Sequence, residues 1–420
     1  MSFVTLPRRG LKAAAAGLAI AAVAGTMTAC SSSASSSGTG SAASGTYTIW
    51  DPYPQYDNSS AWVQLLTKCG TSAGVTVKRT GFDTTDLTSK VLLAAQQGKA
   101  PDVLIVDNPV VSTLAEAGVL TDTSATKVDT SAIEPNLLAA GQLNGKTYGI
   151  PIGANTLALY YNKNVLQAAG VDPAGVKDWA SLNTALAKIK TAGKKGITFS
   201  AIGTEEGSFQ FLPWFWGAGA NLTDLSSGSS VDALNLWTTW LKDGYAPNSV
   251  LQDTQTTSWQ EFATGQVGFA ENGTWQLSNA KKAGFPYGII PIPAKSGGTA
   301  AAPTGGEFVT VPVQGDTARY ATSEKLVSCL SSADNAYTTD TALGYIGATG
   351  AVQQKQSADS DLVPWVQAVQ AAKGRTSDNL GTKYPKISQA LWTAVQAALS
   401  GSASVSGALQ SAQNSAASAK

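Results

Sequence analysis

The chain has 420 residues, more than a single domain usually holds, which predicts two domains. Its net charge is zero and only 13% of its residues are charged, so it lacks the basic surface that nucleic acid or an acidic membrane would require. It contains no histidine, which excludes the commonest general base, the commonest transition-metal ligand and any catalytic pair of serine or cysteine with histidine. Its 11 tryptophans predict large cores or a site lined by aromatic rings.

The first 29 residues have the features of a signal peptide. Three basic residues, Arg8, Arg9 and Lys12, precede the apolar segment Ala13–Ala24, which is too short to span a membrane comfortably. Small residues then lead to a cysteine. We therefore expect an exported protein.

The residues Met27 to Cys30 resemble a bacterial lipobox, which implies that Cys30 is lipidated and becomes the first residue of the mature chain. Residues 30–45 consist mainly of Ser, Ala and Gly, and such a tether cannot bury a core. We expect the protein on the extracellular face of the cell membrane, held there through the lipid alone. A secreted protein cleaved near Ala29 is the alternative.

The next segments alternate between apolar runs and helical periodicity. The order strand, helix, strand, helix, strand predicts a parallel, doubly wound sheet, in which ligands bind beyond the carboxyl ends of the strands. Those ends fall at Trp50-Asp51 and at Asp107-Asn108. The expected elements are strands at Tyr47–Trp50, Val75–Thr80 and Asp102–Asp107, a helix through Trp62 and Cys69 capped by Gly70, and a helix from Thr84 or Thr85 to Gly98.

The segment from Leu143 to Lys163 organises the rest of the prediction. Asn144-Gly145 indicates a hairpin turn, Pro151 interrupts the apolar run that follows, and Thr156–Tyr161 is again strand-like. Two extended pieces joined by this kink form either a strap between two lobes or an ordinary hairpin within one sheet.

Beyond the strap, helices and strands continue to alternate. A polar loop at residues 203–207 contains Glu205 and Glu206, which we expect to be solvated. The segment Phe209–Trp216 is too aromatic for a solvent-facing surface and belongs to a core or to a site. The expected helices are Val110–Ala117, Asn164–Ala169, Trp179–Thr191, Val231–Leu241, Trp259–Thr264, one after Thr322, one after Asp340, Leu362–Lys373 and Lys386–Leu399; the expected strands are Ile197–Ala201 and Tyr287–Pro293.

Several motifs in this order resemble the extracellular solute-binding proteins of ABC importers, in particular the maltose- and oligosaccharide-binding group. They are NGK-Y-GIP, LYYNK, PWFWGAGA, FAENGTW and the C-terminal YPKISQALWTAVQAALSG, and the resemblance extends from about Tyr47 to Leu409. It implies a two-lobed α/β fold of type II, with a mainly parallel sheet flanked by helices in each lobe and the ligand cleft between the lobes. It also implies that Gln266–Asn272 is the strand that carries the second lobe's binding tryptophan, and that Pro303–Thr310 holds a glycine pair before a returning strand. The expected parts are residues 46–152 plus 304–348 for lobe 1, and 153–303 plus 349–412 for lobe 2.

The resemblance also implies a function. We expect a monomeric binding protein, not an enzyme, that needs no cofactor or metal and delivers a carbohydrate to the transmembrane subunits of an ABC permease. Aromatic rings stack on the C–H faces of a sugar, while charged side chains bind its hydroxyls. The expected ligand-binding residues, most securely Asp51, Asp107 and Trp275, are Trp50, Asp51, Asp107, Tyr160, Phe209, Trp214, Trp216, Trp275, Gly306, Glu307 and Arg375. Which rings of residues 209–216 face the cleft is left open, and a surface position is the alternative for Arg375.

Two cysteines, Cys69 and Cys329, remain once Cys30 is lipidated. Two free buried thiols and a disulfide are equally compatible with the sequence. The resemblance favours the disulfide, because it places both cysteines on helices of the same lobe.

Two other functions fit the same residues. A surface-anchored glycoside hydrolase needs two carboxylates, one with a raised pKa, and Asp51, Asp107 and Glu307 are candidates. The same fold could instead bind a non-sugar solute, although the chain lacks the histidines and the carboxylate cluster that a metal site would need.

Overall fold

The computed structural model describes residues 46–376 and 380–418, apart from the side chains of Thr84 and Thr85. The expected signal peptide, the lipidation site Cys30 and the tether lie outside the described residues. Within the described ranges, no helix has both the length and the apolar character needed to cross a bilayer.

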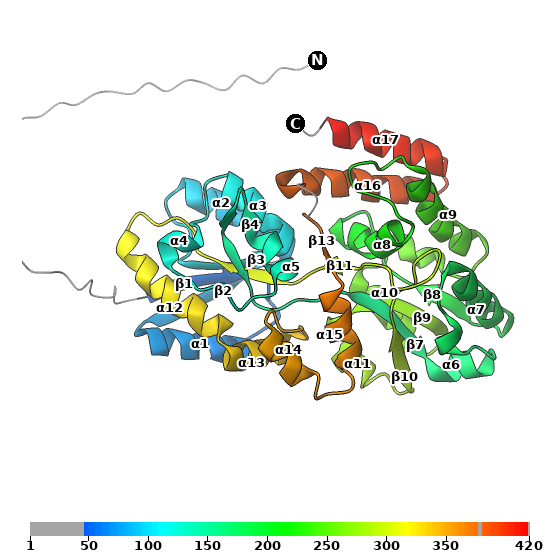
Figure 1. The fold of residues 1–420 in the computed structure, drawn as a ribbon, viewed down its shortest axis with the longest axis horizontal. Helices are drawn as coiled ribbons and strands as arrows, with labels where there is room; N and C mark the ends of the chain where they lie inside the picture. The colour runs from blue at the N-terminus through cyan, green and yellow to red at the C-terminus, as the bar shows by residue number, and fades with distance from the viewer. Residues whose placement is uncertain (1–45, 377–379, 419–420) are drawn as a thin grey trace, which may run out of the picture. The chain divides into compact units, whose positions relative to one another are not determined.

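The first sheet, whose strands β1, β2 and β3 lie in the left-hand part of Figure 1, has five strands in the order β2-β1-β3-β12-β6. The strands β1 (Thr46–Asp51), β2 (Thr76–Gly81) and β3 (Val103–Asp107) are parallel, as the sequence predicts. The strands β12 (Glu307–Thr310) and β6 (Gly149–Pro151) extend the sheet in antiparallel fashion beside β3. A late segment of the chain therefore lies directly beside the carboxyl end of β3.

Helices cover both faces of this sheet. They are α1 (Ala61–Ala73), α2 (Thr84–Gln96), α3 (Asn108–Glu116), α4 (Thr123–Thr126), α5 (Pro135–Leu138), α12 (Tyr320–Ser331) and α13 (Ala333–Leu343), with 3-10 turns η1 (Ala139–Gly141) and η5 (Thr317–Arg319). Alternate residues of the strands point to opposite faces, so Val103 and Ile105 pack with α1 and α12, whereas Leu104 and Val106 pack with α2 and α3.

The predicted cap of the first helix is wrong. Helix α1 continues through Gly70 to Ala73 and is capped by Gly74, which has a φ of 78°. Gly70 serves packing instead, because a Cβ at this position would lie 2.5 Å from the Val77 side chain on β2. The helices expected after Thr322 and after Asp340 both start earlier than predicted, because Thr322 lies within α12 and Asp340 within α13.

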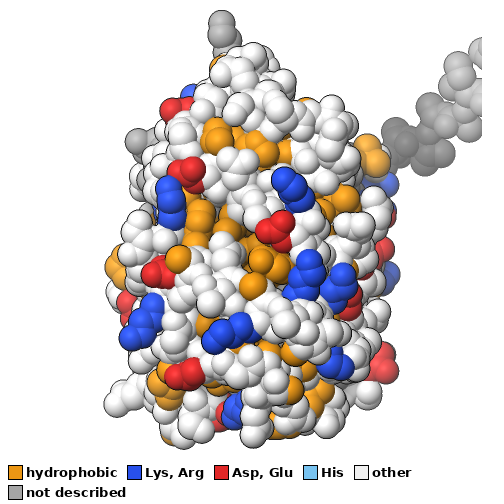
Figure 2. Space-filling model, turned by 90° about the vertical axis from the view of Figure 1, so that its right-hand side faces the viewer, with side chains coloured by type: hydrophobic (Ala, Val, Ile, Leu, Met, Phe, Trp, Pro, Cys, Tyr) orange, Lys and Arg blue, Asp and Glu red, His pale blue; other side chains and the backbone are white. Residues whose placement is uncertain are grey.

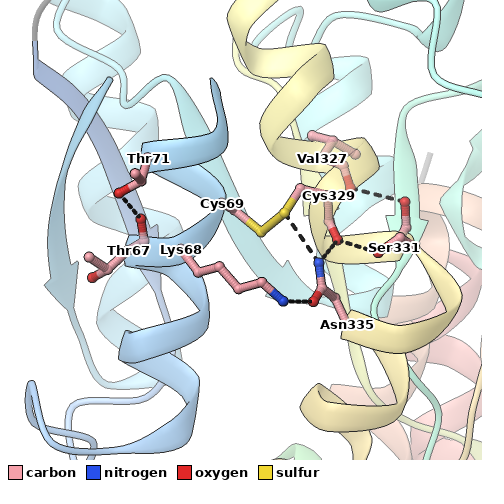
Figure 3. The surroundings of a disulfide bond; sticks show 9 residues. Thr67, Lys68, Cys69, Thr71, Val327, Cys329, Ser331 and Asn335 are labelled. Atoms are coloured by element: carbon pink, nitrogen blue, oxygen red, sulfur yellow. Dashed lines mark hydrogen bonds between the residues drawn. A yellow bond between two sulfur atoms is a disulfide. The ribbon is translucent and has the colours of Figure 1, made fainter. Parts of the chain in front are cut away.

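A disulfide joins α1 to α12 (Figure 3). Cys69 and Cys329 have a Cα–Cα distance of 5.7 Å and are 260 residues apart in the sequence. Beside them, the Lys68 ammonium donates a hydrogen bond to Asn335 on α13 at 2.8 Å. Both cysteines belong to the first lobe, as the resemblance implies.

The second sheet has the order β10-β7-β9-β8, made from β7 (Leu157–Asn162), β8 (Lys195–Thr198), β9 (Val267–Gly273) and β10 (Tyr287–Ile290). The remaining helices are α6 (Lys163–Ala168), α7 (Trp179–Thr191), α8 (Glu205–Gly217), α9 (Gly228–Lys242), α10 (Gln255–Ala263), α11 (Leu277–Ala280), α14 (Gly350–Gln356), α15 (Val363–Gln370), α16 (Tyr384–Leu399) and α17 (Val405–Ala417), with 3-10 turns η2 (Pro173–Gly175), η3 (Asn248–Leu251), η4 (Thr274–Gln276) and η6 (Gly381–Lys383). Leu157 and Leu159 point to one face of the sheet with α7, α8, α9, α16 and α17, and Ala158 and Tyr160 point to the other with α10, α11 and α15. The sequence did not predict α17.

The segment from Leu143 to Lys163 is a strap between the lobes, and the alternative of a hairpin within one sheet is wrong. Asn144-Gly145 does turn the small hairpin of β4 (Gln142–Leu143) and β5 (Lys146–Thr147), with positive φ at both residues. Downstream, however, β6 belongs to the first sheet and β7 to the second.

Other segments cross beside this strap. Ala154 exchanges backbone hydrogen bonds with Ile346 at 2.7 and 2.8 Å, and Asn155 exchanges them with Gly305 at 3.2 and 2.8 Å. Next to them, β11 (Pro303–Thr304) pairs in parallel with β13 (Lys373–Gly374). The lobes are thus joined by several extended segments that are hydrogen-bonded to one another, and we call these segments the crossing strands.

The surface matches the low charge of the sequence. On the face that Figure 2 shows, lysine and arginine side chains are interspersed with aspartate and glutamate, and neither sign forms a continuous patch. Some charged side chains are buried instead, among them Asp51, Asp102 and Arg375.

Candidate functional site

A pair of carboxylates lies at the edge of the first sheet. Asp107 ends β3 and Glu307 begins β12, and the antiparallel register places the two residues directly opposite each other. Opposite residues have their Cβ atoms about 4.5–5.5 Å apart on the same face of the sheet. Both side chains keep part of their surface exposed.

Glu307 has an unusual environment. Burial, followed by the negative charge of Asp107, raises the pKa of Glu307 from 4.5 to about 7, while the Tyr345 hydroxyl and the Arg375 cation act in the opposite direction. The Tyr345 hydroxyl donates to Glu307, and the hydroxyls of Tyr345 and Tyr53 are 3.1 Å apart. Glu307 can therefore accept or donate a hydrogen bond near neutral pH.

Arg375 connects this pair to the second lobe. Its guanidinium donates to Asp107 Oδ1 at 2.8 Å and to Asn108 Oδ1 at 3.0 Å on the first lobe, and to Glu205 Oε1 at 2.7 Å on the second. It also lies 4.9 Å from the centre of the Phe209 ring. Because Arg375 is only 2% exposed, the alternative of a surface cation is wrong.

Glu205 is not the solvated loop residue that the sequence predicts. It begins α8, where the helix dipole favours a negative charge, and it accepts hydrogen bonds from Tyr384 at 2.6 Å and Ser388 at 2.5 Å on α16. These donors are 179 and 183 residues away in the sequence, so no local pattern indicated them.

Aromatic rings lie beside the charged groups. The centroids of Phe209 on α8 and Trp275 in η4 are 6.4 Å apart, and both rings belong to or pack against the core of the second lobe. A Cβ on Gly273 would lie 2.0 Å from the Trp275 ring, so the glycine permits the position of this tryptophan. Trp216 is the last residue of the aromatic segment Phe209–Trp216, and the Lys373 ammonium lies 5.3 Å from the centre of its ring.

The structure places other expected residues in the cores. Trp214 is fully buried and donates to Glu271 Oε2 at 2.8 Å, and Tyr160 is fully buried and donates to the Gly273 carbonyl at 2.9 Å. Tyr160 thereby anchors the turn that carries Trp275. Neither ring lies with the carboxylate pair.

Asp51 and Trp50 also have structural surroundings. Asp51 is fully buried, forms an ion pair with Arg79 at 2.5 Å and accepts from Trp62 Nε1 at 3.0 Å and from the backbone of Tyr53 at 3.1 Å. Trp50 packs edge-on against Phe82 at 4.9 Å. Asp51 thus orients the loop that supplies Tyr53, and its own oxygens already have protein partners.

Gly306 belongs to the crossing strands. It has a φ of 104°, and a Cβ there would lie 2.7 Å from the Gly153 carbonyl on the strap. This glycine lets the chain approach the strap closely just before Glu307.

We call the group Asp107, Glu205, Glu307, Arg375, Phe209 and Trp275, with Tyr53 and Tyr345, the junction cluster. Sequence reasoning missed Tyr345, for which the sequence carries no signal, and Tyr53, whose loop differs from the family pattern. A separate surface groove runs along the edge strand β10, but its Lys281 is paired with Asp361 at 3.0 Å and the groove contains no expected residue.

Two helix-flanked sheets joined by crossing strands, with a polar and aromatic cluster at the junction, define a two-lobed α/β binding protein. A family model described as bacterial extracellular solute-binding protein matches residues 64–374. The chain belongs to this family.

Individual relatives are more distant. A maltodextrin-binding protein of Bacillus subtilis, MdxE, is 28% identical over 62% of this chain and 63% of its own length, and a putative binding protein of Brucella abortus is 32% identical over 37% of this chain and 40% of its own length. The chain therefore spans less than two thirds of these sequence relatives.

Solved structures agree with the expected type II fold. The GacH receptor of Streptomyces glaucescens, determined unliganded and in complex with acarbose, has a TM-score of 0.76 at 24% identity and covers 90% of this chain and 98% of its own. The predicted two-lobed α/β fold of type II is confirmed. The expectation of a mainly parallel sheet in each lobe is wrong for the second lobe, because β7 is antiparallel to both β10 and β9 and only β8 and β9 are parallel.

Proposed function

We propose that the protein binds a carbohydrate at the junction cluster and delivers it to an ABC permease. The observation that carries the proposal is the combination of Phe209 and Trp275 rings with the opposed carboxylates Asp107 and Glu307 where the lobes meet. Rings supply faces for the C–H surface of a sugar, and the carboxylates bind hydroxyls. The relative named as a maltodextrin-binding protein and the fold neighbour determined in complex with acarbose support this ligand class.

Within this proposal the expected residues divide by role. Asp107, Glu307, Phe209, Trp275 and the partly buried Trp216 contact the ligand. The others shape the site, and they are Trp50, Asp51, Tyr160, Trp214, Gly306 and Arg375.

The proposal also covers the boundaries of the lobes, the oligomeric state and the attachment to the membrane. Residues 46–152 plus 304–348 form lobe 1, and residues 153–303 plus 349–412 form lobe 2. The protein acts as a monomer attached through a lipid at Cys30, which fits the extracellular family to which it belongs. The ligand contacts both lobes, so it has its highest affinity for the closed arrangement and shifts the population towards it.

The experiment titrates a soluble form of the protein, which begins at Ser31, with mono- and oligosaccharides. Tryptophan fluorescence and calorimetry monitor binding. We expect a saturable change in the wild type and a loss of at least tenfold in affinity in Trp275→Ala. As a matched control, Trp259→Phe alters a tryptophan that packs on Tyr160 in the core and should leave affinity unchanged. No binding by any sugar would contradict the proposal.

Glycoside hydrolysis is the second candidate, because one member of the carboxylate pair has a raised pKa. Chromatography of the recovered ligand separates the two functions. Unaltered sugar supports the binding protein, and cleaved sugar would support the hydrolase and overturn the first proposal.

A further inference from the structure

Arg375 lies where the chain crosses between the lobes. It follows β13 directly, and β13 pairs with β11 in the bundle of crossing strands. The position of its backbone is therefore tied to the hinge, whereas its side chain extends to partners on both sides.

Those partners come from different lobes. Asp107 and Asn108 stand at the junction of β3 and α3, in the first lobe. Glu205 and Phe209 stand on the first turns of α8, in the second. The distances of 2.7 to 3.0 Å from the guanidinium to the oxygens are those of charge-assisted hydrogen bonds.

A buried guanidinium depends strongly on such partners. Arg375 is 2% exposed, and removing one partner of a buried ion pair leaves an uncompensated charge. If the lobes separate, the Asp107 and Glu205 carboxylates move apart, and the guanidinium cannot keep both. Its full set of partners exists only while the lobes are together.

We propose that Arg375 is an interlobe latch that favours the closed arrangement before any ligand arrives. It is a positioning residue, and the ligand need not touch it. The inference rests on the proposed function only in coupling closure to sugar affinity; the latch itself requires no ligand.

The coupling has a defined form. When only the closed arrangement binds tightly, the apparent dissociation constant equals the intrinsic one divided by the closed fraction. A fall in the closed fraction from about one half to about one twentieth therefore weakens apparent affinity about tenfold.

The chain offers a matched control. Arg319 forms an ion pair of 2.5 Å with Asp102, whose side chain is 4% exposed. Arg319 ends η5 directly before α12, and Asp102 precedes β3, so both ends of this pair belong to the first lobe. Its loss disturbs a buried ion pair without affecting contact between lobes.

The test measures the distance between the lobes in the ligand-free protein. Spin labels are attached at Ser89→Cys on α2 and Asn235→Cys on α9, which are exposed positions of different lobes. Double electron–electron resonance then gives the distribution of the distance between the two labels. We expect a short-distance population in the wild type and in Arg319→Met, and its loss in Arg375→Met. Identical distributions in wild type and Arg375→Met, or no short-distance population in the wild type, would overturn the latch.

A second variant guards against misfolding. Glu205→Gln removes only the charge on the second lobe's side and keeps the shape of the side chain. A reduced short-distance population with an unchanged circular dichroism spectrum supports the latch, and an unchanged population refutes it. Sugar titration of the same variants then separates the proposals, because the distances can shift as expected even if no sugar binds.

Discussion

The titration of Glu307 gives a measurable pH dependence of stability. The pKa of this side chain is raised from 4.5 to about 7 in the folded protein, mainly by burial and then by Asp107. Below pH 4.5 the folded and unfolded chains both hold the proton, and as the pH rises towards 7 the unfolded chain releases it first. At about 1.4 kcal/mol per pH unit, Glu307 therefore lowers the free energy of unfolding by about 3 kcal/mol between pH 4.5 and 7.

The assay compares wild type with Glu307→Gln in urea unfolding at intervals from pH 4 to 8. The other buried carboxyls with raised pKa values, Asp340 and Glu271, are present in both proteins and cancel in the difference. We expect Glu307→Gln to gain about 3 kcal/mol relative to the wild type over this range. Glu116→Gln, which changes an exposed carboxylate at the end of α3, serves as the control and should run parallel to the wild type. Parallel curves for Glu307→Gln as well would refute the assigned environment.

Three further predictions concern other parts of the fold. Replacing Cys69 and Cys329 by Ala should lower the free energy of unfolding by up to about 5 kcal/mol, because the disulfide closes a loop of 260 residues. Equal urea midpoints of the wild type with and without reductant would contradict this. Burial alone raises the pKa of Asp340. The free energy of unfolding of Asp340→Asn, measured in urea, should therefore rise relative to that of the wild type by about 1.4 kcal/mol per pH unit above about pH 4. A difference between the two proteins that does not change with pH would argue against a buried neutral carboxyl. Gly153→Ala should lower the melting temperature more than Gly98→Ala, because a Cβ at Gly153 would lie 2.2 Å from the Asp340 side chain whereas a Cβ at Gly98 would meet open space. Similar melting temperatures would show that the backbone of the strap moves to accommodate the methyl group.

Local sequence patterns predicted the elements that depend on local chemistry. Asn144-Gly145 turned as expected because both residues tolerate positive φ, and helix α7 runs from Trp179 to Thr191 as its periodicity indicated. The antiparallel half of the first sheet could not be read in this way. β12 pairs with β3 across about 200 residues of chain, and its neighbour is chosen by the fold and not by its own sequence.

The aromatic segment shows where site prediction reaches its limit. Phe209 and Trp216 are seven residues apart on α8 and therefore share a face, while Phe211 and Trp214 lie nearer the opposite side. Helical spacing thus sorts the rings into two sets. It cannot say which set meets the other lobe, because that depends on Arg375 and Trp275 from other segments.

The charges of the junction cluster also bear on the kind of ligand. The single guanidinium of Arg375 is already matched by Asp107 and Glu205, one carboxylate from each lobe. An anionic ligand would have to compete with these carboxylates for a buried cation, which leaves a carboxylate without its partner. A neutral ligand with hydroxyl groups imposes no such loss, because Glu307 can donate or accept according to its protonation and the phenol of Tyr53 lies within reach of the same hydrogen-bonded chain. The charge arrangement therefore favours an uncharged polyhydroxylated ligand, which is the class that the aromatic rings also favour.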